Sequence, residues 1–192
     1  MDRGYDRFFQ QNPMPEQEAR KLFAHMRLVS FAKGDYVMRQ GEFNSNLYVI
    51  DRGIWSGVEK RADNADITLW FAFSGEAVFN VWSYVMDKLS PINIISETES
   101  TAWVIGKSEL EQLTRDDADI HDCFQKIILG HLAYYENRLL HMSKPSNSSE
   151  RYLWLTEWHP ELLREVPLSR IASFLGVTIQ SLSRIRKNIF RK

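Results

Sequence analysis

The chain has 192 residues, of which 44% are hydrophobic and 26% are charged, and its single cysteine is Cys123. This composition is ordinary for a soluble globular protein and excludes a disordered chain, a collagen-like repeat and a coiled-coil rod. One cysteine excludes an internal disulfide and a four-cysteine metal site. No apolar run approaches the roughly 20 residues of a membrane-spanning helix, and the first residues lack the apolar region of a secretory leader. The expected location is therefore a reducing cytoplasm, with no membrane partner.

The charge is distributed unevenly along the chain. From residue 147 onward there are eight basic and four acidic residues, a net charge of +4, whereas residues 1–146 have 16 basic and 21 acidic residues, a net charge of −5. A basic C-terminal segment on an acidic body indicates a polyanionic partner for that segment alone. The alternative is an ordinary solvated, charged tail.

The first two thirds of the chain change from a helical to a strand-like pattern. Residues 13–26 predict a short helix whose apolar side contains Leu22, Phe23 and Met26. After it, short runs of β-branched and aromatic residues alternate with turn signals. These runs predict strands at 29–31, 36–38, 47–50, 54–59, 67–73 and 101–105, with a short helix within 79–89. Short strands at this spacing are typical of an antiparallel sandwich or jelly roll.

The pattern is helical again from residue 107, and residues 116–142 predict one helix roughly 40 Å long. Its apolar stripe contains Ile120, Phe124, Ile127, His131, Tyr134 or Tyr135, and Arg138. A barrel of this size has difficulty covering so long a helix, so we expect the stripe to pair with its own copy in a two-fold dimer. The alternative is that the stripe packs on its own barrel.

The segment 144–151, KPSNSSER, is the clearest domain boundary, and Ser148 or Ser149 is expected to cap the helix that follows it. Further helices are expected at 149–158, 168–175 and 179–190. The chain therefore divides into a jelly-roll domain at 1–115, a long helix at 116–143 and a helical domain at 144–192.

The segment 168–187 has the pattern of a helix-turn-helix. Gly176 can adopt the left-handed conformation that ends a helix, and Thr178 can cap the next one. A small shared core is predicted for Ile171, Ala172, Leu175, Val177, Leu182 and Ile185. This arrangement is typical of DNA-binding helix pairs.

The solvent side of the second helix carries DNA-compatible chemistry. Glutamine can pair with adenine and arginine with guanine in the major groove, whereas hydroxyls, lysine and the helix N-terminus suit phosphates. The residues expected to contact DNA are Ser169, Thr178, Ile179, Gln180, Ser181, Ser183, Arg184 and Lys187. Ordinary solvated charge would explain Arg184 and Lys187 alone, but the turn motif favours DNA.

The order of elements resembles that of the Crp/Fnr transcription regulators, from about residue 26 to residue 191. The resemblance is carried by FAKGDYVMRQGE at 31–42, NLYVIDRG at 46–53 and YLWLTEWHPELLREVPLSRIASFLGVTIQSLSRIRK at 152–187. It implies an α+β fold with an effector-sensing antiparallel jelly roll, a dimerisation helix and a helix-turn-helix domain. It also implies a homodimeric regulator whose partners are double-stranded DNA, its own copy and RNA polymerase. Ile179 stands where the best-known members have an arginine, so their base preference is not carried over.

The effector site departs from the family pattern. Cyclic-nucleotide-binding members have a Gly-Glu-Leu cassette followed by an arginine that pairs with the phosphate. Here residues 79–81 read Phe-Asn-Val, residues 90–92 read Ser-Pro-Ile, and Lys88 is the nearest cation. A buried phosphate would lack its counter-charge, so cyclic AMP is not the expected effector. No cofactor is expected, and one cysteine excludes an iron–sulfur cluster.

Aromatic residues surround the altered cassette. The predicted effector pocket contains Phe71, Phe79, Asn80, Val81, Trp82 and Tyr84. It either takes an apolar or aromatic ligand or is filled by its own side chains.

Two other classes of function stay open. The barrel could bind a nucleotide or another small molecule while the C-terminal helices dock a protein partner. A metal-dependent jelly-roll enzyme would need a bound metal, but the histidines are dispersed and no catalytic motif is present, so neither a metal site nor an enzyme is expected.

Overall fold

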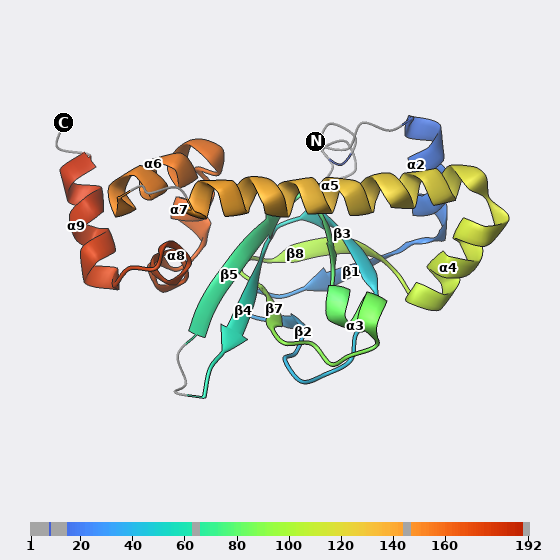
Figure 1. Cartoon of the computed structure of the whole chain (residues 1–192), viewed down its shortest axis with the longest axis horizontal. Coiled ribbons are helices and arrows are strands. Elements are labelled where there is room, and N and C mark those ends of the chain that lie inside the picture. The colour runs from blue at the N-terminus through green and yellow to red at the C-terminus, as the bar shows by residue number, and fades with distance from the viewer. Residues whose placement is uncertain (1–7, 9–14, 63–65, 144–146, 190–192) are drawn as a thin grey trace.

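The structure is a computed structural model that describes residue 8 and residues 15–62, 66–143 and 147–189. Two four-stranded antiparallel sheets form a barrel, a long helix runs along it, and a group of short helices lies at one end (Figure 1). The strand orders are β1-β8-β3-β6 and β2-β7-β4-β5. The predicted fold class, a jelly roll followed by a helical domain, is confirmed.

The strands are short and joined by tight turns. They are β1 Arg27–Phe31, β2 Tyr36–Met38, β3 Leu47–Arg52, β4 Ile54–Lys60, β5 Asp66–Phe73, β6 Ala77–Phe79, β7 Asn93–Ser96 and β8 Ser100–Ile105. The six predicted strands are present, with ends that shift by up to two residues. The sequence analysis missed β6 and β7, which have three and four residues.

The described helices are α2 Glu16–His25, α3 Val81–Met86, α4 Lys107–Asp116, α5 Ala118–Ser143, α6 Ser148–Trp158, α7 Leu162–Glu165, α8 Leu168–Leu175 and α9 Ile179–Ile189. The long helix begins at residue 118 rather than 116. Asp117 has an extended backbone, and its carboxylate accepts the N–H groups of Asp119 and Ile120. The cap of α6 is Asn147, not a serine, because its side chain accepts the N–H of Glu150 at 2.9 Å.

Aromatic side chains fill the interior of the barrel. Phe31, Tyr48 and Trp55 meet edge to face, with ring centroids 5.4–6.5 Å apart. Trp70 lies directly over Gly57, where an added Cβ would come within 2.1 Å of the indole ring. A residue with a side chain at position 57 would therefore displace Trp70. The barrel centre is packed by the chain itself, as expected for a small barrel.

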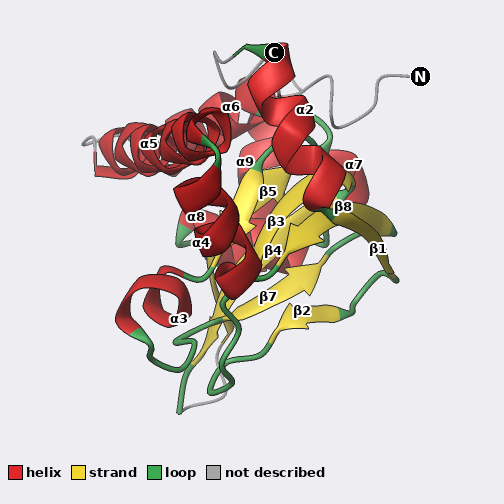
Figure 2. Cartoon of the chain, turned by 90° about the vertical axis from the view of Figure 1, so that its right-hand side faces the viewer, coloured by secondary structure: helices red, strands yellow, loops and turns green. Residues whose placement is uncertain are grey.

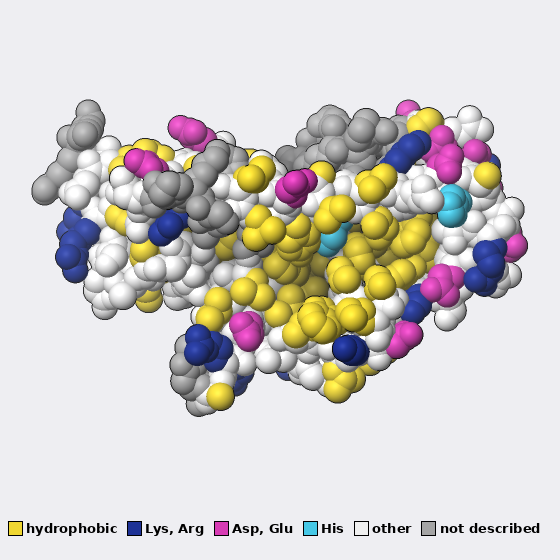
Figure 3. Space-filling view, in the orientation of Figure 1, with side chains coloured by type: hydrophobic (Ala, Val, Ile, Leu, Met, Phe, Trp, Pro, Cys, Tyr) yellow, Lys and Arg dark blue, Asp and Glu magenta, His cyan; other side chains and the backbone are white. Residues whose placement is uncertain are grey.

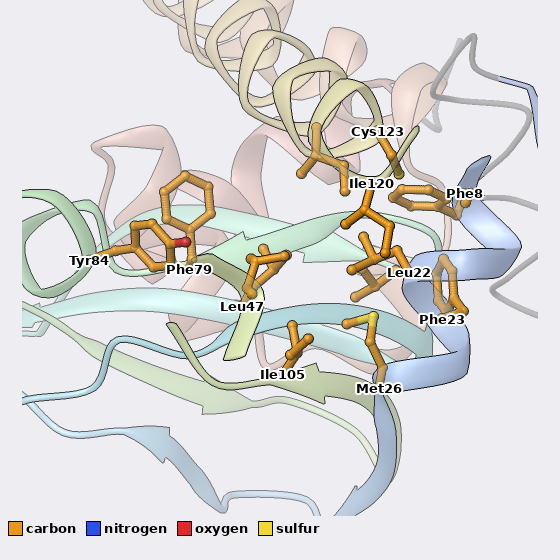
Figure 4. Close-up of a cluster of buried hydrophobic side chains, with 14 residues drawn as sticks. Phe8, Leu22, Phe23, Met26, Leu47, Phe79, Tyr84, Ile105, Ile120 and Cys123 are labelled. Carbon is orange, nitrogen blue, oxygen red and sulfur yellow. The ribbon is translucent and has the colours of Figure 1, made fainter. Parts of the chain in front are cut away.

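Helix α5 covers the barrel together with α2 (Figure 2). Ile120, Cys123 and Ile127 are buried in a cluster with Phe8 and Leu22 (Figure 4). This placement corrects the assignment of Ile120 and Ile127 to a dimer interface, because both are at most 2% exposed within one chain.

The rest of the predicted stripe also faces its own barrel. Phe124 packs against the same cluster, the ring of His131 lies 4.7 Å from that of Phe79, and the hydroxyl of Tyr134 donates to the carbonyl of Phe71 at 2.8 Å. The side chain of Arg138 lies outside the described residues. Periodicity identified the apolar side of α5 correctly, but the surface that covers it belongs to the same chain.

Candidate nucleic-acid interface and effector groove

The turn between α8 and α9 has the geometry that the sequence predicts. Gly176 is left-handed, with φ 68° and ψ 34°, and its N–H bonds to the carbonyls of Ala172 and Ser173. Thr178 caps α9, because its hydroxyl oxygen accepts the N–H of Ser181 at 3.1 Å. A glycine ends the first helix and a threonine begins the second, so the turn is set by local sequence.

A small core holds the two helices together. Leu182 of α9 is fully buried, and Ile171, Ala172 and Leu175 of α8 are buried around it. Tyr152 of α6 joins the same cluster. One side of α9 is therefore fixed against α8, which leaves its opposite side facing outward.

Most of the residues predicted to contact DNA lie on the outward side of α9. Those exposed there are Thr178, Ile179, Gln180, Ser183, Arg184 and Lys187, and Ser181 is half-buried beneath the cap. Gln180, Arg184 and Lys187 follow a four- and three-residue spacing, so they share one face. No acidic residue follows Glu165 in the sequence, so no carboxylate of this segment opposes a polyanion.

Helix α8 faces the barrel instead of solvent. The guanidinium of Arg170 contacts the Asp66 carboxylate at 2.8 Å and the Glu97 carboxylate at 3.2 Å. Glu97 is 5% exposed and also accepts the hydroxyl of Ser56. Ser173 completes the contact by donating to the carbonyl of Asp66 while it accepts the N–H of Thr68, both at 2.9 Å. Ser169, expected to contact DNA, is exposed at the edge of this contact.

Aromatic contacts extend this docking surface. The rings of Phe71 and Phe174 lie 5.2 Å apart, and Phe73 stacks on His159 with centroids 3.4 Å apart. The helical domain is thus docked on β5 by both polar and apolar contacts, with α9 at the end of the molecule opposite α4 (Figure 1).

Polar side chains of the altered cassette form hydrogen bonds within the cassette itself. The side-chain oxygen of Asn80 accepts the N–H groups of Trp82 and Ser83, which are the first-turn donors of α3. Ser90, at the position of the family's arginine, bonds to the carbonyl and N–H of Ile92. Lys88 lies 5.7 Å from the centroid of the Trp82 ring. The Nδ2 group of Asn80 is buried without a hydrogen-bond partner, so the altered cassette keeps one free donor but has a serine where the family's arginine would pair with a phosphate.

A large apolar groove lies beside the cassette, between α3, α5 and β5, with a volume of about 1000 Å³. Figure 3 shows the hydrophobic side chains that gather on this hollowed face. Of the predicted effector residues, the groove brings together Phe79, Asn80, Val81 and Trp82. Phe71 lines a smaller, adjoining cavity that Phe79 also lines, and Tyr84 is buried against Phe79 and Phe124.

Comparison with protein families supports the assignment of the barrel. Residues 28–117 match the family model of the cyclic nucleotide-binding domain. The match covers a little less than half of the chain. No curated protein matches the sequence.

Solved structures extend the likeness over most of the chain. FixK2 from Bradyrhizobium japonicum has a TM-score of 0.70 at 15% identity, covering 86% of this chain and 85% of FixK2. The c-di-GMP-responsive global regulator CLP of Xanthomonas campestris has a TM-score of 0.67 at 16% identity, covering 92% of each chain. A cyclic nucleotide-binding domain from Methylobacillus flagellatus has a TM-score of 0.61 at 12% identity, covering 70% and 80%. The fold is that of Crp/Fnr-type regulators.

The contact between the cyclic nucleotide-binding domain and α8 escaped the sequence analysis. Arg170 and Asp66 are 104 residues apart, and nothing in the local pattern of either segment indicates the pairing. The need of Glu97 for a partner follows only from its burial, which the structure shows and the sequence does not.

Two more findings concern the part of the chain that the structure describes. No group of three or more His, Cys, Asp or Glu residues there is placed to hold a metal ion. Within the same residues, no helix combines the length and apolar character needed to cross a membrane.

Proposed function

We propose that this protein is a homodimeric, sequence-specific DNA-binding regulator of transcription. The observation that carries the proposal is the outward face of α9, which presents Gln180, Arg184 and Lys187 while Leu182 anchors the opposite side. In this role α9 enters the major groove, Gln180 and Arg184 contact base edges, and Lys187 contacts phosphate. The fold shared with Crp/Fnr-type regulators supports the same role.

The proposed dimer uses the outer side of α5 rather than the predicted stripe. The large side chains exposed on this helix are Leu129, Leu132, Leu139 and Leu140, each between 58% and 65% exposed. Leu132 and Leu139 are seven residues apart and line the apolar groove beside α3. Such a seam of leucines fits the same seam on a second copy, as in a coiled coil. Two copies would place their α9 helices about 34 Å apart, one turn of the duplex.

The dimer is tested by sedimentation. Replacing Leu132 and Leu139 together by glutamate places charges in the seam, so the protein is expected to sediment as a monomer. The control is Leu153→Glu, which changes a leucine that is 40% exposed on α6 and lies outside the seam. Sedimentation of both variants as dimers would exclude this surface.

Within this proposal, cyclic AMP is not the effector. Asn80 occupies the N-terminus of α3, and Ser90 replaces the cation that a cyclic phosphate would need. The barrel centre is filled by Phe31, Tyr48 and Trp55. A phosphate placed there would be buried without a counter-charge.

The function is tested by selecting bound sequences from a pool of random duplexes. The selection is run without an effector, with cyclic AMP and with c-di-GMP, the dinucleotide in the description of CLP. Recovery of a palindrome without any nucleotide supports the proposal. A palindrome that requires cyclic AMP would overturn the interpretation of Ser90, and no enrichment under any condition would overturn DNA recognition by α9.

A further inference from the structure

A second cavity lies where three parts of the molecule meet. It has a volume of about 300 Å³, at the lower end of the range for small-molecule sites. Its walls come from β5 and β6 of the barrel, from α5, and from Trp158 and His159 at the end of α6. We call it the junction cavity.

The junction cavity and the apolar groove adjoin each other, because both are lined by Trp70, Phe79, His131 and Tyr135, but they extend along different flanks of α5. Helical spacing places Leu132 and Leu139 on the flank of the groove, and Gly130, Tyr134 and Asn137 on the flank of the junction cavity. A dimer formed through the leucine seam therefore leaves the junction cavity uncovered by that contact.

Gly130 is an unusual residue at its position. It lies near the middle of a 26-residue helix, where glycine destabilises by roughly 1 kcal/mol relative to alanine. Its spacing from Ile127 and Tyr134 places it on the flank that lines the cavity. Because Gly130 itself lines the cavity, a larger side chain at this position is expected to reduce the space in it.

Two titratable groups that line the cavity, Glu76 and His131, have pKa values shifted towards their uncharged forms. Burial raises the pKa of Glu76 to about 8, and the backbone N–H of Phe73 donates to its carboxyl group at 3.1 Å. Burial lowers the pKa of His131 to about 4, against an opposing hydrogen bond to the backbone of Ala77. A protonated carboxyl can donate a hydrogen bond, and a neutral imidazole attracts neither anions nor cations strongly. Neither group therefore offers a charge to a bound ligand, and His159, which also lines the cavity, already contacts the Glu161 carboxylate at 2.9 Å. A charged ligand would lose its hydration without gaining a free counter-charge.

The walls of the cavity are largely aromatic. Trp70 and Phe71 line it from β5, Phe79 from β6, Tyr134 from α5 and Trp158 from the helical domain. The rings of Tyr134 and Trp158 lie 5.7 Å apart, so the cavity opens beside an existing aromatic contact between α5 and the helical domain. Aromatic walls favour a flat ligand, which can stack on them.

We propose that the junction cavity binds a small, uncharged aromatic compound whose carbonyl or amide oxygen accepts a hydrogen bond from the carboxyl group of Glu76. The bound compound contacts the barrel, α5 and the helical domain together. Its occupancy is therefore expected to restrict motion of the helical domain relative to the barrel.

The test uses three compounds of one shape and different charge: benzamide, benzoate and benzamidine. Each is titrated into the full-length protein without DNA, and binding is followed by the NMR signal of the Trp158 indole N–H, assigned with Trp158→Phe. Benzamide is expected to give a saturable shift, with benzoate and benzamidine at least about tenfold weaker because each brings an unpaired charge. Equal binding of all three, or no saturable shift with benzamide, would overturn the proposal.

Variants locate the site. Gly130→Leu places a larger side chain, and a good helix former, on the wall of the cavity and is expected to abolish the benzamide shift. The control Ala133→Leu adds the same side chain at an exposed position that lines neither the junction cavity nor the apolar groove, so the shift is expected to stay. Glu76→Gln keeps an uncharged donor and is expected to retain binding, whereas Glu76→Ala is expected to weaken it about tenfold. Retention of binding in Gly130→Leu would place the compound elsewhere. Because no DNA is present, failure here is distinct from failure of the proposed regulatory function.

Discussion

The two helices of the helix-turn-helix differ in what they contact. Helix α8 is tied to the barrel, where Arg170 reaches two carboxylates and Ser173 bonds to the backbone of β5. The outward side of α9 contains no acidic residue and is exposed around Arg184 and Lys187. Because both helices share the core around Leu182, a shift of α8 on the barrel must move α9 with it. Under the proposed function, α8 would transmit the state of the barrel and α9 would make the contact with DNA.

The largest expected effect is a loss of stability when the core shared by α8 and α9 is weakened. Leu182→Ala removes a fully buried side chain from their shared core and is expected to reduce the free energy of unfolding by about 2–5 kcal/mol. Denaturation followed by tryptophan fluorescence reports this loss through Trp154 and Trp158, which pack against that core. The control Ile179→Ala truncates an exposed residue and should change stability by less than about 0.5 kcal/mol. Equal stabilities of the two variants would contradict the shared core.

The next effect tests the attachment of α8. Arg170→Ala leaves the nearly buried Glu97 without its cation, which is expected to cost about 1–3 kcal/mol and to accelerate amide hydrogen exchange in α8 and β5. Arg170→Lys keeps the charge but loses the forked geometry, so an intermediate result is expected. Arg164→Ala, an exposed arginine of α7, is the matched control. Unchanged exchange in Arg170→Ala would show that the ion pairs do not hold α8 on the barrel.

A smaller effect is expected for base recognition by α9. Arg184→Ala should reduce discrimination by about 1–3 kcal/mol at one base pair of each half-site, because one side chain contacts one base. Competition binding with single-base variants of the selected duplex measures this change. Asn188→Ala, exposed further along α9, is expected to leave the preferences unchanged. Uniform weakening across all variants would assign Arg184 to phosphate.

The smallest expected effect is on binding to the phosphates of the DNA backbone. Lys187→Ala is expected to weaken binding to all sequences alike and to lower the slope of log affinity against log salt by about 1, since one fewer counterion is released. Binding of a selected and an unrelated duplex over a range of salt concentrations measures both quantities. A change confined to the selected duplex would contradict the assignment.

The sequence predicted the parts of this molecule that depend on neighbours in the chain. Gly176 and Thr178 form the turn through bonds within a few residues, and both roles were visible in the pattern. The apolar side of α5 was equally visible, but periodicity does not say what covers it. Ile127 proved to face its own barrel, and the exposed seam lies instead at Leu132 and Leu139.

Contacts between segments far apart in the sequence could not be predicted, because they depend on the complete fold. The bridge from Arg170 to Asp66 joins segments whose proximity depends on the whole fold. Asn80 and Ser90 showed in the sequence that the cassette departs from the family pattern. Their hydrogen bonds to α3 and to Ile92 could be found only in the structure. The junction cavity needed the barrel, α5 and the helical domain in place together.

The central claim, that α9 lies in the major groove, is tested most directly by cutting DNA from that helix. A DNA-cleaving iron chelate is attached to Gln180→Cys, while the native Cys123 stays unmodified because it is fully buried and burial raises its pKa to about 12. Cleavage is expected in two clusters about 10 base pairs apart on the selected duplex, and only background cleavage from Glu109→Cys on α4. Absence of clusters from position 180, or equal cleavage from both positions, would contradict the account.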